Sequence, residues 1–313
     1  MAKVLVTGGA GFIGSNLVRA LIERGDDVRV IDNFSTGNRA NLEGLDVEVI
    51  EGELRSYERV HNAVRGAEVV YHLGALGSVP RSLERPLPSH HANATGTLMV
   101  LEAARRHQVP QVIFSSSSSV YGANPVLPRQ ESLRPMPVSP YAVAKLAAES
   151  YALAYSSCFG LSVLPFRFFN VFGPRQGAHH AYAAVVPRFV SAALAGQPLR
   201  VHGDGRQTRD FTYVGNVTEV IADAILRGVG TSDVVNLAFG ARISLLELVA
   251  ELEDLLGRRL EVVHEAPRAG DVRDSQADFA RLRELFPSVR QHPLREGLAQ
   301  TVSWMSGHVL AGQ

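Results

Sequence analysis

A glycine-rich turn near the start of the chain constrains the fold more than any other feature. Residues 4–14 read VLVTGGAGFIG, so a short apolar run passes directly into glycines and then into an amphipathic stretch. Gly8 and Gly11 let the backbone turn tightly and approach a pyrophosphate, and Gly14 lets a helix pack closely on the strand. The N-terminus of that helix presents free N–H groups to the anion. The pattern predicts a dinucleotide-binding turn.

Asp32 indicates which dinucleotide is bound. It ends the second apolar run, at the spacing where a carboxylate accepts hydrogen bonds from both ribose hydroxyls and repels a 2′-phosphate. The joint spacing of the glycines and Asp32 therefore predicts NAD rather than NADP. The alternative is a plain tight turn in which Asp32 caps a loop.

Short β-branched runs alternate with amphipathic stretches along the first half of the chain. The expected strands are residues 3–7, 28–32, 47–51, 68–72, 111–115 and 161–166, and the expected helices are residues 13–23, 93–107 and 141–157. Strands that alternate with helices in this way form a parallel sheet covered by helices on both faces. We therefore predict an α/β fold with a Rossmann-type, doubly wound parallel sheet.

The alternation breaks near residue 168, where the sequence becomes rich in loop residues such as Pro174 and Gly203. A later helix is expected over residues 245–256, with Ser244 as its N-cap. We predict an NAD-binding domain over residues 1–168, with a returning segment near 208–237. Residues 169–313 are expected to form a smaller substrate-binding lobe that is interleaved with the sheet.

Composition excludes several other classes of function. The 313 residues hold 31 Lys and Arg against 31 Asp and Glu, so no field of one sign attracts nucleic acid or anionic lipid. No apolar stretch reaches the roughly twenty residues that cross a bilayer. The single cysteine, Cys158, is expected to be a buried helix residue without a disulfide partner. We expect a cytoplasmic protein with a small-molecule partner, and no membrane, nucleic acid or metal.

A second motif, YAVAK over residues 141–145, supplies the chemistry. Tyr141 and Lys145 are four residues apart on an expected helix and share one face, and a run of five serines, residues 115–119, ends the preceding strand. A free tyrosine has a pKa near 10, and we expect the Lys145 ammonium and a positive nicotinamide ring to lower it. This arrangement predicts the transfer of a hydride and a proton on an alcohol. The alternative is an ordinary pair on a helix surface.

Taken together, these motifs resemble those of the extended short-chain dehydrogenase/reductase family, and within it the NAD-dependent UDP-hexose 4-epimerases. The matching stretches cover essentially the whole chain. They are TGGAGFIG, DNFSTG, HLGALGSVPRS, SSSSSVYG, YAVAK, RFFNVFGPRQ, GDGRQTRDFTYV and PRAGDVRDS.

The resemblance implies roles for individual residues. Ser117, Tyr141 and Lys145 match the catalytic positions, with Tyr141 as the base and Ser117 as a hydroxyl in its proton network. The positions that match NAD contacts are Gly8, Gly11, Phe12, Ile13, Asp32, Asn33, Ser35, Thr36, Gly37, Glu53, Leu54, Leu73, Ala75, Tyr141 and Lys145; Glu53 and Leu54 depart from the usual residues near the adenine. The positions that match substrate contacts are Ser78, Ser117, Ser118, Ser119, Tyr141, Asn170, Val186, Arg209, Arg268, Asp271 and Ser275.

The serine run distinguishes between the reactions of this family. The related 4,6-dehydratases carry an Asp-Glu pair where this chain has Ser118 and Ser119, and the decarboxylating relatives place a Glu at the Ser119 position. Without a carboxylate there, the resemblance implies epimerisation. Tyr141 would remove the proton of the sugar 4-hydroxyl as NAD accepts the hydride, the 4-keto sugar would rotate, and both would return on the other face.

UDP-glucuronate is the substrate that the resemblance favours, ahead of UDP-N-acetylglucosamine and UDP-glucose. Ser275 occupies a position that gates pocket size, and its small side chain leaves room for a carboxylate or an N-acetyl group. The arginine that glucuronate-specific members carry after Gln176 is missing, and His179 and His180 are alternative donors. Two other classes remain as alternatives: a net NAD-dependent dehydrogenase or dehydratase, and a cofactor-sensing regulatory protein.

A homodimer is expected by analogy with the family. The helices expected at residues 93–107 and 141–157 carry apolar side chains that would form a two-fold four-helix interface or, alternatively, only the internal core. These side chains are Leu98, Val100, Leu101, Leu146, Tyr151 and Leu153.

Overall fold

A seven-stranded parallel sheet forms the centre of the protein. The computed structural model describes residues 1–178, 182–231, 233–266 and 272–311, and side chains as far as residue 307. The strand order is β11-β6-β5-β4-β1-β2-β3. The strands are β1 (Lys3–Thr7), β2 (Asp27–Asp32), β3 (Glu48–Glu51), β4 (Val69–His72), β5 (Gln111–Ser117), β6 (Val163–Phe168) and β11 (Val235–Leu237). Each neighbouring pair is parallel, which confirms the predicted Rossmann-type fold.

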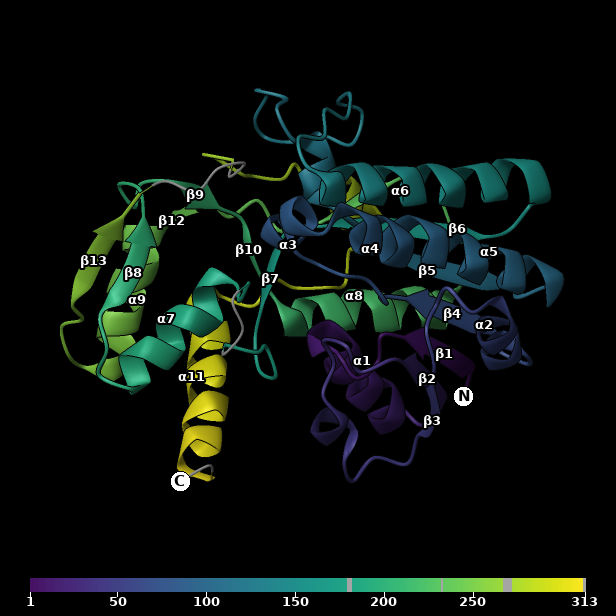
Figure 1. Ribbon diagram of the computed structural model, residues 1–313, viewed down its shortest axis with the longest axis horizontal. Coiled ribbons are helices and arrows are strands. Elements are labelled where there is room, and N and C mark those ends of the chain that lie inside the picture. The colour runs from purple at the N-terminus through teal and green to yellow at the C-terminus, as the bar shows by residue number, and fades with distance from the viewer. Residues whose placement is uncertain (179–181, 232, 267–271, 312–313) are drawn as a thin grey trace.

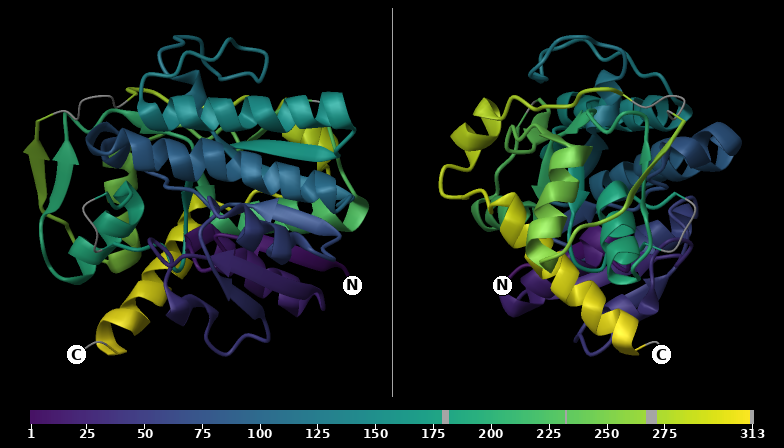
Figure 2. Two further views of the ribbon diagram at one scale, coloured as in Figure 1. Left: turned by 45° about the vertical axis from the view of Figure 1, so that its right-hand side comes forward. Right: turned by 90° about the vertical axis from the view of Figure 1, so that its left-hand side faces the viewer.

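Helices cover both faces of this sheet, as Figures 1 and 2 show. Side chains alternate along β1, so Val4 and Val6 face one core cluster while Leu5 faces another. The first cluster is covered by α1 (Phe12–Glu23) and α8 (Val214–Arg227). The second is covered by α2 (Tyr57–Val64), α5 (Gly96–Arg106) and α6 (Pro140–Phe159). Between β4 and α5 lie α3 (Val79–Glu84), α4 (Pro86–His90) and a π-helical turn (His91–Thr95), so α5 begins later than expected.

The chain returns to this sheet twice after residue 168. First, α8 packs on α1, and β11 extends the sheet beside β6. Second, α10 (Ala280–Leu285) packs against β11, and its Leu282 and the following residue Phe286 lie in the α1 and α8 core cluster. Two segments of the second half of the chain are therefore packed on the central sheet.

The smaller lobe lies beside one end of the sheet, with β8, β13, α7 and α9 at the left of Figure 1. Three two-stranded sheets pair β7 (Asn170–Phe172) with β10 (Phe211–Tyr213), β8 (Leu199–His202) with β13 (Val262–Glu265), and β9 (Thr208–Arg209) with β12 (Ile243–Ser244). Helices α7 (Val185–Leu194), α9 (Leu245–Leu256) and α11 (Leu294–Ala311) pack around a third core cluster. Ser244 is the N-cap of α9, as the sequence predicted, and it forms a capping box with Glu247.

One expectation about burial needs correction, and one alternative left open by the sequence is decided for two residues. Cys158 is exposed, because the last turn of α6 extends beyond the packed part of the helix. Val100 and Leu101, two of the residues considered for a dimer interface, are 0% and 1% exposed and lie in the core between α5 and the sheet. Among the described residues, no helix is both long and apolar enough to span a membrane.

Candidate active site

A cavity of about 1170 Å³ lies at the carboxyl ends of the central strands. This is the edge of an open parallel sheet where ligands bind. The residues that the sequence assigned to NAD line it, with the exception of Gly37: they are Gly8, Gly11, Phe12, Ile13, Asp32, Asn33, Ser35, Thr36, Glu53, Leu54, Leu73, Ala75, Tyr141 and Lys145. Gly37 instead packs against Ala10, where a Cβ would lie 2.9 Å from the Ala10 carbonyl carbon.

The turn between β1 and α1 can be built only with glycine at two positions. Gly8 has φ of +70°, and a Cβ there would lie 2.8 Å from the Cα of Gly74 on the neighbouring loop. A Cβ on Gly14 would lie 2.3 Å from the carbonyl oxygen of Gly8. These glycines therefore allow the turn to pack tightly on itself and on the neighbouring loop. The first helix turn lines the cavity, which fits the pyrophosphate of a dinucleotide.

Asp32 ends β2 inside this cavity and is 8% exposed. Its Oδ2 accepts a hydrogen bond from the Ala10 N–H at 3.0 Å, and its Oδ1 accepts one from the Phe34 N–H at 2.8 Å. Burial raises the pKa of this carboxyl, and the backbone hydrogen bonds oppose that shift. A carboxylate has about four acceptor positions, so one remains for a ribose hydroxyl, and the backbone hydrogen bonds hold the group in place for the predicted contact.

The three predicted catalytic residues meet at one side of the same cavity. Ser117 ends β5, while Tyr141 and Lys145 lie in the first turns of α6, which begins at Ser139 as N-cap and Pro140. A hydrogen bond joins the side chains of Ser117 and Tyr141. The fold thus brings together a phenol and a hydroxyl that are 24 residues apart in the sequence.

The electrostatics of this group differ from the expectation in one respect. The Lys145 ammonium donates to the Ser115 carbonyl oxygen at 2.8 Å, and burial lowers its pKa to about 8. Burial raises the pKa of Tyr141, and the hydrogen bond with Ser117 opposes the shift only in part. The protein's own residues therefore raise the pKa of the phenol, because desolvation of the phenolate outweighs its neighbours.

Ser119 contacts Ser117 rather than the cavity. Both the N–H and the hydroxyl of Ser119 donate to the Ser117 Oγ, at 3.2 and 2.9 Å. Since these two bonds occupy the lone pairs of Ser117, its own proton is free to point towards Tyr141. Ser118, Ser119 and Ser275 line neither this cavity nor the adjoining one, so their predicted sugar contacts remain predictions.

A second cavity, of about 320 Å³, adjoins the first, since Val171, Gln176 and Tyr182 line both. It contains the predicted substrate residues Ser78, Asn170, Val186 and Arg209. Residues that the sequence did not single out also line it, among them Arg200, His202 and Gln207. Arg268, Asp271, His179 and His180 lie outside the described residues. Among the described residues, no group of three or more His, Cys, Asp or Glu side chains is placed to hold a metal ion.

Asp210, next to Arg209, is a buried residue that the sequence analysis missed. Its Oδ2 accepts from the N–H groups of Gly240 and Ala277 at 3.1 and 2.9 Å, while its Oδ1 has no hydrogen-bond partner. Burial raises its pKa to about 7 from an ordinary value of 3.8. Asp210 therefore connects the strand that carries Arg209 to two distant loops. Its burial favours the neutral form of the carboxyl.

We expect this carboxyl to make stability depend on pH. Its pKa is higher in the folded state than in the unfolded state, so its contribution is fully present below about pH 4 and is lost as pH rises through about 7. Asp210→Asn should remove this part of the pH dependence and stabilise the protein by on the order of 2 kcal/mol at pH 8 relative to wild type. Urea unfolding of both proteins at pH 5 and pH 8 measures the difference. Equal slopes of stability against pH would contradict the assignment.

Known proteins match this chain over nearly its whole length. A model of the NAD dependent epimerase/dehydratase family matches residues 4–238. The UDP-glucose 4-epimerase of Mycolicibacterium smegmatis is 36% identical over 315 residues, which cover 96% of this chain and 98% of that protein. The UDP-N-acetyl-alpha-D-glucosaminuronate decarboxylase of Bacillus cytotoxicus is 32% identical over 315 residues, covering 96% and 97%.

Solved structures align over nearly the whole chain. The UDP-N-acetylglucosamine 4-epimerase of Methanobrevibacter ruminantium, in complex with UDP-N-acetylmuramic acid, has a TM-score of 0.92 at 36% identity and covers 98% of this chain and 99% of its own. The UDP-glucuronic acid 4-epimerase of Bacillus cereus, in complex with UDP-glucuronic acid and NAD, has a TM-score of 0.90 at 29% identity, with the same coverage.

Proposed function

This chain belongs to the NAD-dependent epimerase/dehydratase family, and from that premise we propose that it inverts C4 of a UDP-sugar through a transient 4-keto sugar. One observation carries the proposal. Ser117, Tyr141 and Lys145 line the cavity that also contains the glycine turn and Asp32, and a second cavity with Asn170 and Arg209 adjoins it. A nucleotide-sugar and NAD can thus be bound side by side at one set of acid–base groups.

When bound, NAD supplies the oxidant that accepts a hydride from the sugar C4 and returns it. The residues of the chain transfer the proton and stabilise the charge. Tyr141 takes the proton of the 4-hydroxyl and gives it back to the ketone oxygen, and Ser117 donates a hydrogen bond to whichever oxygen carries the negative charge. Lys145 holds a positive charge in the buried site at pH values below about 8. The alcohol is oxidised and then reduced, so the reaction is redox-neutral overall.

The second cavity provides binding remote from the reacting carbon. We propose that Arg209 and Asn170 hold the UDP end while the keto sugar turns its other face to Tyr141, so that binding energy from the nucleotide limits escape. In this proposal residues 1–168, with a returning segment near 208–237, bind NAD, and residues 169–313 bind the nucleotide-sugar.

UDP-glucuronate is the substrate that we propose. Two guanidinium groups, Arg81 and Arg85, line the large cavity together with Tyr141, and neither forms an ion pair within the part of the chain that the structure describes. Arg81 lies over the Tyr182 ring, 5.1 Å from its centroid, at the junction of the two cavities. These residues can supply the positive charge that the missing loop arginine does not. A structural relative that binds UDP-glucuronic acid supports the same choice.

Other substrates and reactions are distinguishable alternatives. The names of the relatives favour UDP-N-acetylglucosamine or UDP-glucose, and one relative is a decarboxylase. Against decarboxylation or dehydration, the positions next to Ser117 hold Ser118 and Ser119 rather than carboxylates. A net dehydrogenase would need the nicotinamide to exchange with solution in each turnover.

The proposal is tested by incubating the purified protein with each UDP-sugar in turn and resolving the products by NMR. We expect UDP-glucuronate to give UDP-galacturonate with the highest kcat/KM and no steady change in NADH absorbance. A higher kcat/KM for another UDP-sugar would overturn the substrate assignment. Release of CO₂ with a UDP-pentose, loss of water, or continuous NADH formation would overturn epimerisation.

We also propose a cytoplasmic homodimer that pairs α5 and α6 with their copies. These two helices lie side by side on the outer face in both views of Figure 2. Val143 and Tyr151 on α6 are 51% and 43% exposed, which leaves apolar surface for a partner helix. Sedimentation of the wild-type protein and of Tyr151→Lys tests the proposal, because a dimer through this face should dissociate in the variant; a wild-type monomer would refute it.

A further inference from the structure

A buried ion pair lies directly beneath the catalytic residues. Glu149 on α6 and Arg167 on β6 are 3% and 4% exposed at their side chains. The Arg167 Nη2 donates to the Glu149 Oε1 at 2.7 Å, and its Nε donates to Oε2 at 3.0 Å. This two-point contact fixes the relative position of the two groups in distance and in direction.

The same carboxylate also holds the serine next to Ser117. The Ser116 hydroxyl donates to the Glu149 Oε2 at 2.6 Å, and it is 3% exposed. Ser116 and Arg167 face each other in the register of β5 and β6. Glu149 thus joins α6 to both strands at the level of the final residues of β5.

Three residues at successive turns of α6 meet the end of β5. Tyr141, Lys145 and Glu149 are spaced by four and share one face of the helix. Tyr141 bonds to Ser117, Lys145 donates to the Ser115 carbonyl, and Glu149 accepts from Ser116. The distance between the hydroxyls of Ser117 and Tyr141 therefore depends on how α6 packs on the strand.

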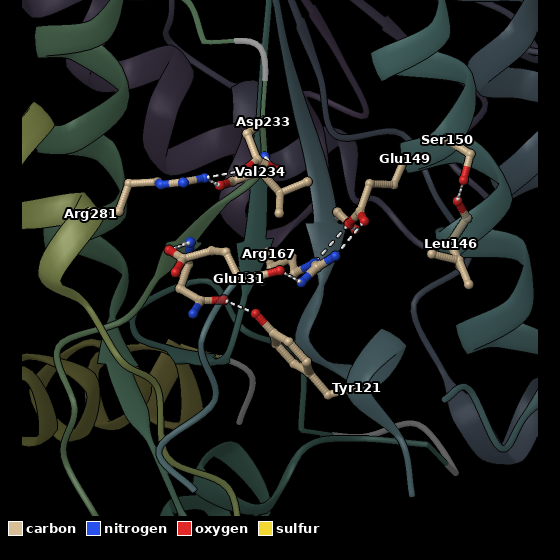
Figure 3. Close-up of polar contacts among 11 residues, drawn as sticks. Tyr121, Glu131, Leu146, Glu149, Ser150, Arg167, Asp233, Val234 and Arg281 are labelled. Carbon is tan, nitrogen blue, oxygen red and sulfur yellow. Dashed lines mark hydrogen bonds and ion pairs between the residues drawn. The ribbon is translucent and has the colours of Figure 1, made fainter. Parts of the chain in front are cut away.

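Arg167 is in turn held by groups on its other side (Figure 3). Its Nη1 donates to the Glu131 carbonyl at 3.2 Å, and its guanidinium lies 4.7 Å from the centroid of the Tyr121 ring. The Tyr121 hydroxyl donates to the Asn236 Oδ1 at 2.6 Å. The ion pair is therefore held in place from both sides.

We propose that Glu149, paired with Arg167, is a positioning residue for the reaction: through Ser116 it sets the separation and orientation of Ser117 and Tyr141. A buried ion pair adds little net stability, because the desolvation of both charges offsets their attraction. Its geometric effect is direct, since Ser116 is covalently joined to Ser117. This inference rests on the proposed function.

Two variants test it, with a third as control. Glu149→Gln keeps the shape but breaks the ion pair, and Ser116→Ala keeps the ion pair but removes its link to β5. Val64→Ala removes core volume in α2, away from the site, and serves as a control for lost stability alone. For each protein, kcat and KM are measured on the UDP-sugar that the wild type converts fastest, and the Tyr141 phenolate is titrated by absorbance against a matching Tyr141→Phe protein.

We expect Glu149→Gln to lower kcat by about 10- to 100-fold with little change in KM, and Ser116→Ala to lower it by about 10-fold. Glu149→Gln removes a negative charge and leaves the Arg167 charge unpaired. The Tyr141 pKa should therefore also fall, because position 149 lies about 12 Å along the helix from Tyr141. Val64→Ala should change neither value. Wild-type kcat in Ser116→Ala, or wild-type kcat and phenolate titration in a folded Glu149→Gln, would overturn the positioning role. Absence of turnover in the wild type would overturn the proposed function instead. The phenolate titration can be measured whether or not the protein turns over a substrate.

Discussion

We expect Tyr141→Phe to lose about three orders of magnitude in kcat while the protein keeps its NAD. In the proposed mechanism the hydroxyl exchanges a proton with the sugar, and a positioned acid–base group contributes about 10²- to 10⁴-fold. The phenyl ring fills the same volume, so the helix and cavity stay intact. The loss should appear in kcat rather than in KM, because in the proposed binding mode the UDP end lies in the second cavity.

Tyr213→Phe is the matched control for this experiment. Its hydroxyl donates to the Gln300 Oε1 in the lobe, and Tyr213 lines neither cavity. We expect its kcat to stay within about threefold of wild type, since surface and remote changes act mainly on stability. Turnover of Tyr141→Phe at a tenth of the wild-type rate or better would show that another group moves the proton.

Gly14→Ala should abolish NAD retention and destabilise the protein by about 1–3 kcal/mol, the usual range for overpacking. The new Cβ would lie 2.3 Å from the Gly8 carbonyl oxygen and 2.8 Å from the Gly9 Cα. Both are backbone atoms of the turn, so the turn must open and the N–H groups that face the pyrophosphate must move. We expect at least a 100-fold weaker affinity for NAD, because the phosphate contacts depend on that backbone.

Gly77→Ala separates this effect from a general loss of glycine. Gly77 lines the same cavity, but a Cβ there would meet no atom within 4 Å. The variant should therefore retain NAD and melt close to wild type. The readouts are the nicotinamide released on denaturation and the shift in melting temperature with added NAD. Retention of NAD by Gly14→Ala would mean that the turn tolerates a side chain and that the binding mode is different.

The elements with strong local signals were predicted with accurate boundaries. β1 spans residues 3–7 and α9 spans residues 245–256, as the sequence indicated. In β1 the apolar run ends at a glycine, and in α9 a Ser-to-Glu capping box starts an amphipathic pattern. Both signals lie within a few residues of the boundary that they define, so no tertiary information is needed.

The strand ends at the site were predicted less well. β5 continues to Ser117 and β6 to Phe168, each two residues beyond the prediction. A run of serines has no apolar periodicity, so it gives no strand signal. Here the ladder of hydrogen bonds with the neighbouring strand extends the element, and Ser116 pairs with Arg167 in that ladder.

The buried polar contacts could not be derived from the sequence. Glu149 and Arg167 are 18 residues apart, and Asp210 accepts from Ala277 across 67 residues. Glu, Arg and Asp side chains are usually exposed, so the sequence alone predicts that these residues lie on the surface. Their burial and the pKa shift of Asp210 arise only when distant segments pack together.

The linear order of residues was enough to predict the glycine turn, the position of Asp32 at the end of β2 and the Tyr141 and Lys145 pair, because each is a local pattern with short spacing. Folding alone established that Lys145 bonds to Ser115, that Tyr141 has a raised pKa, and that Glu149 seats α6 on β5. The physical reason is that desolvation and long-range contacts depend on three-dimensional packing, which no short stretch of sequence contains.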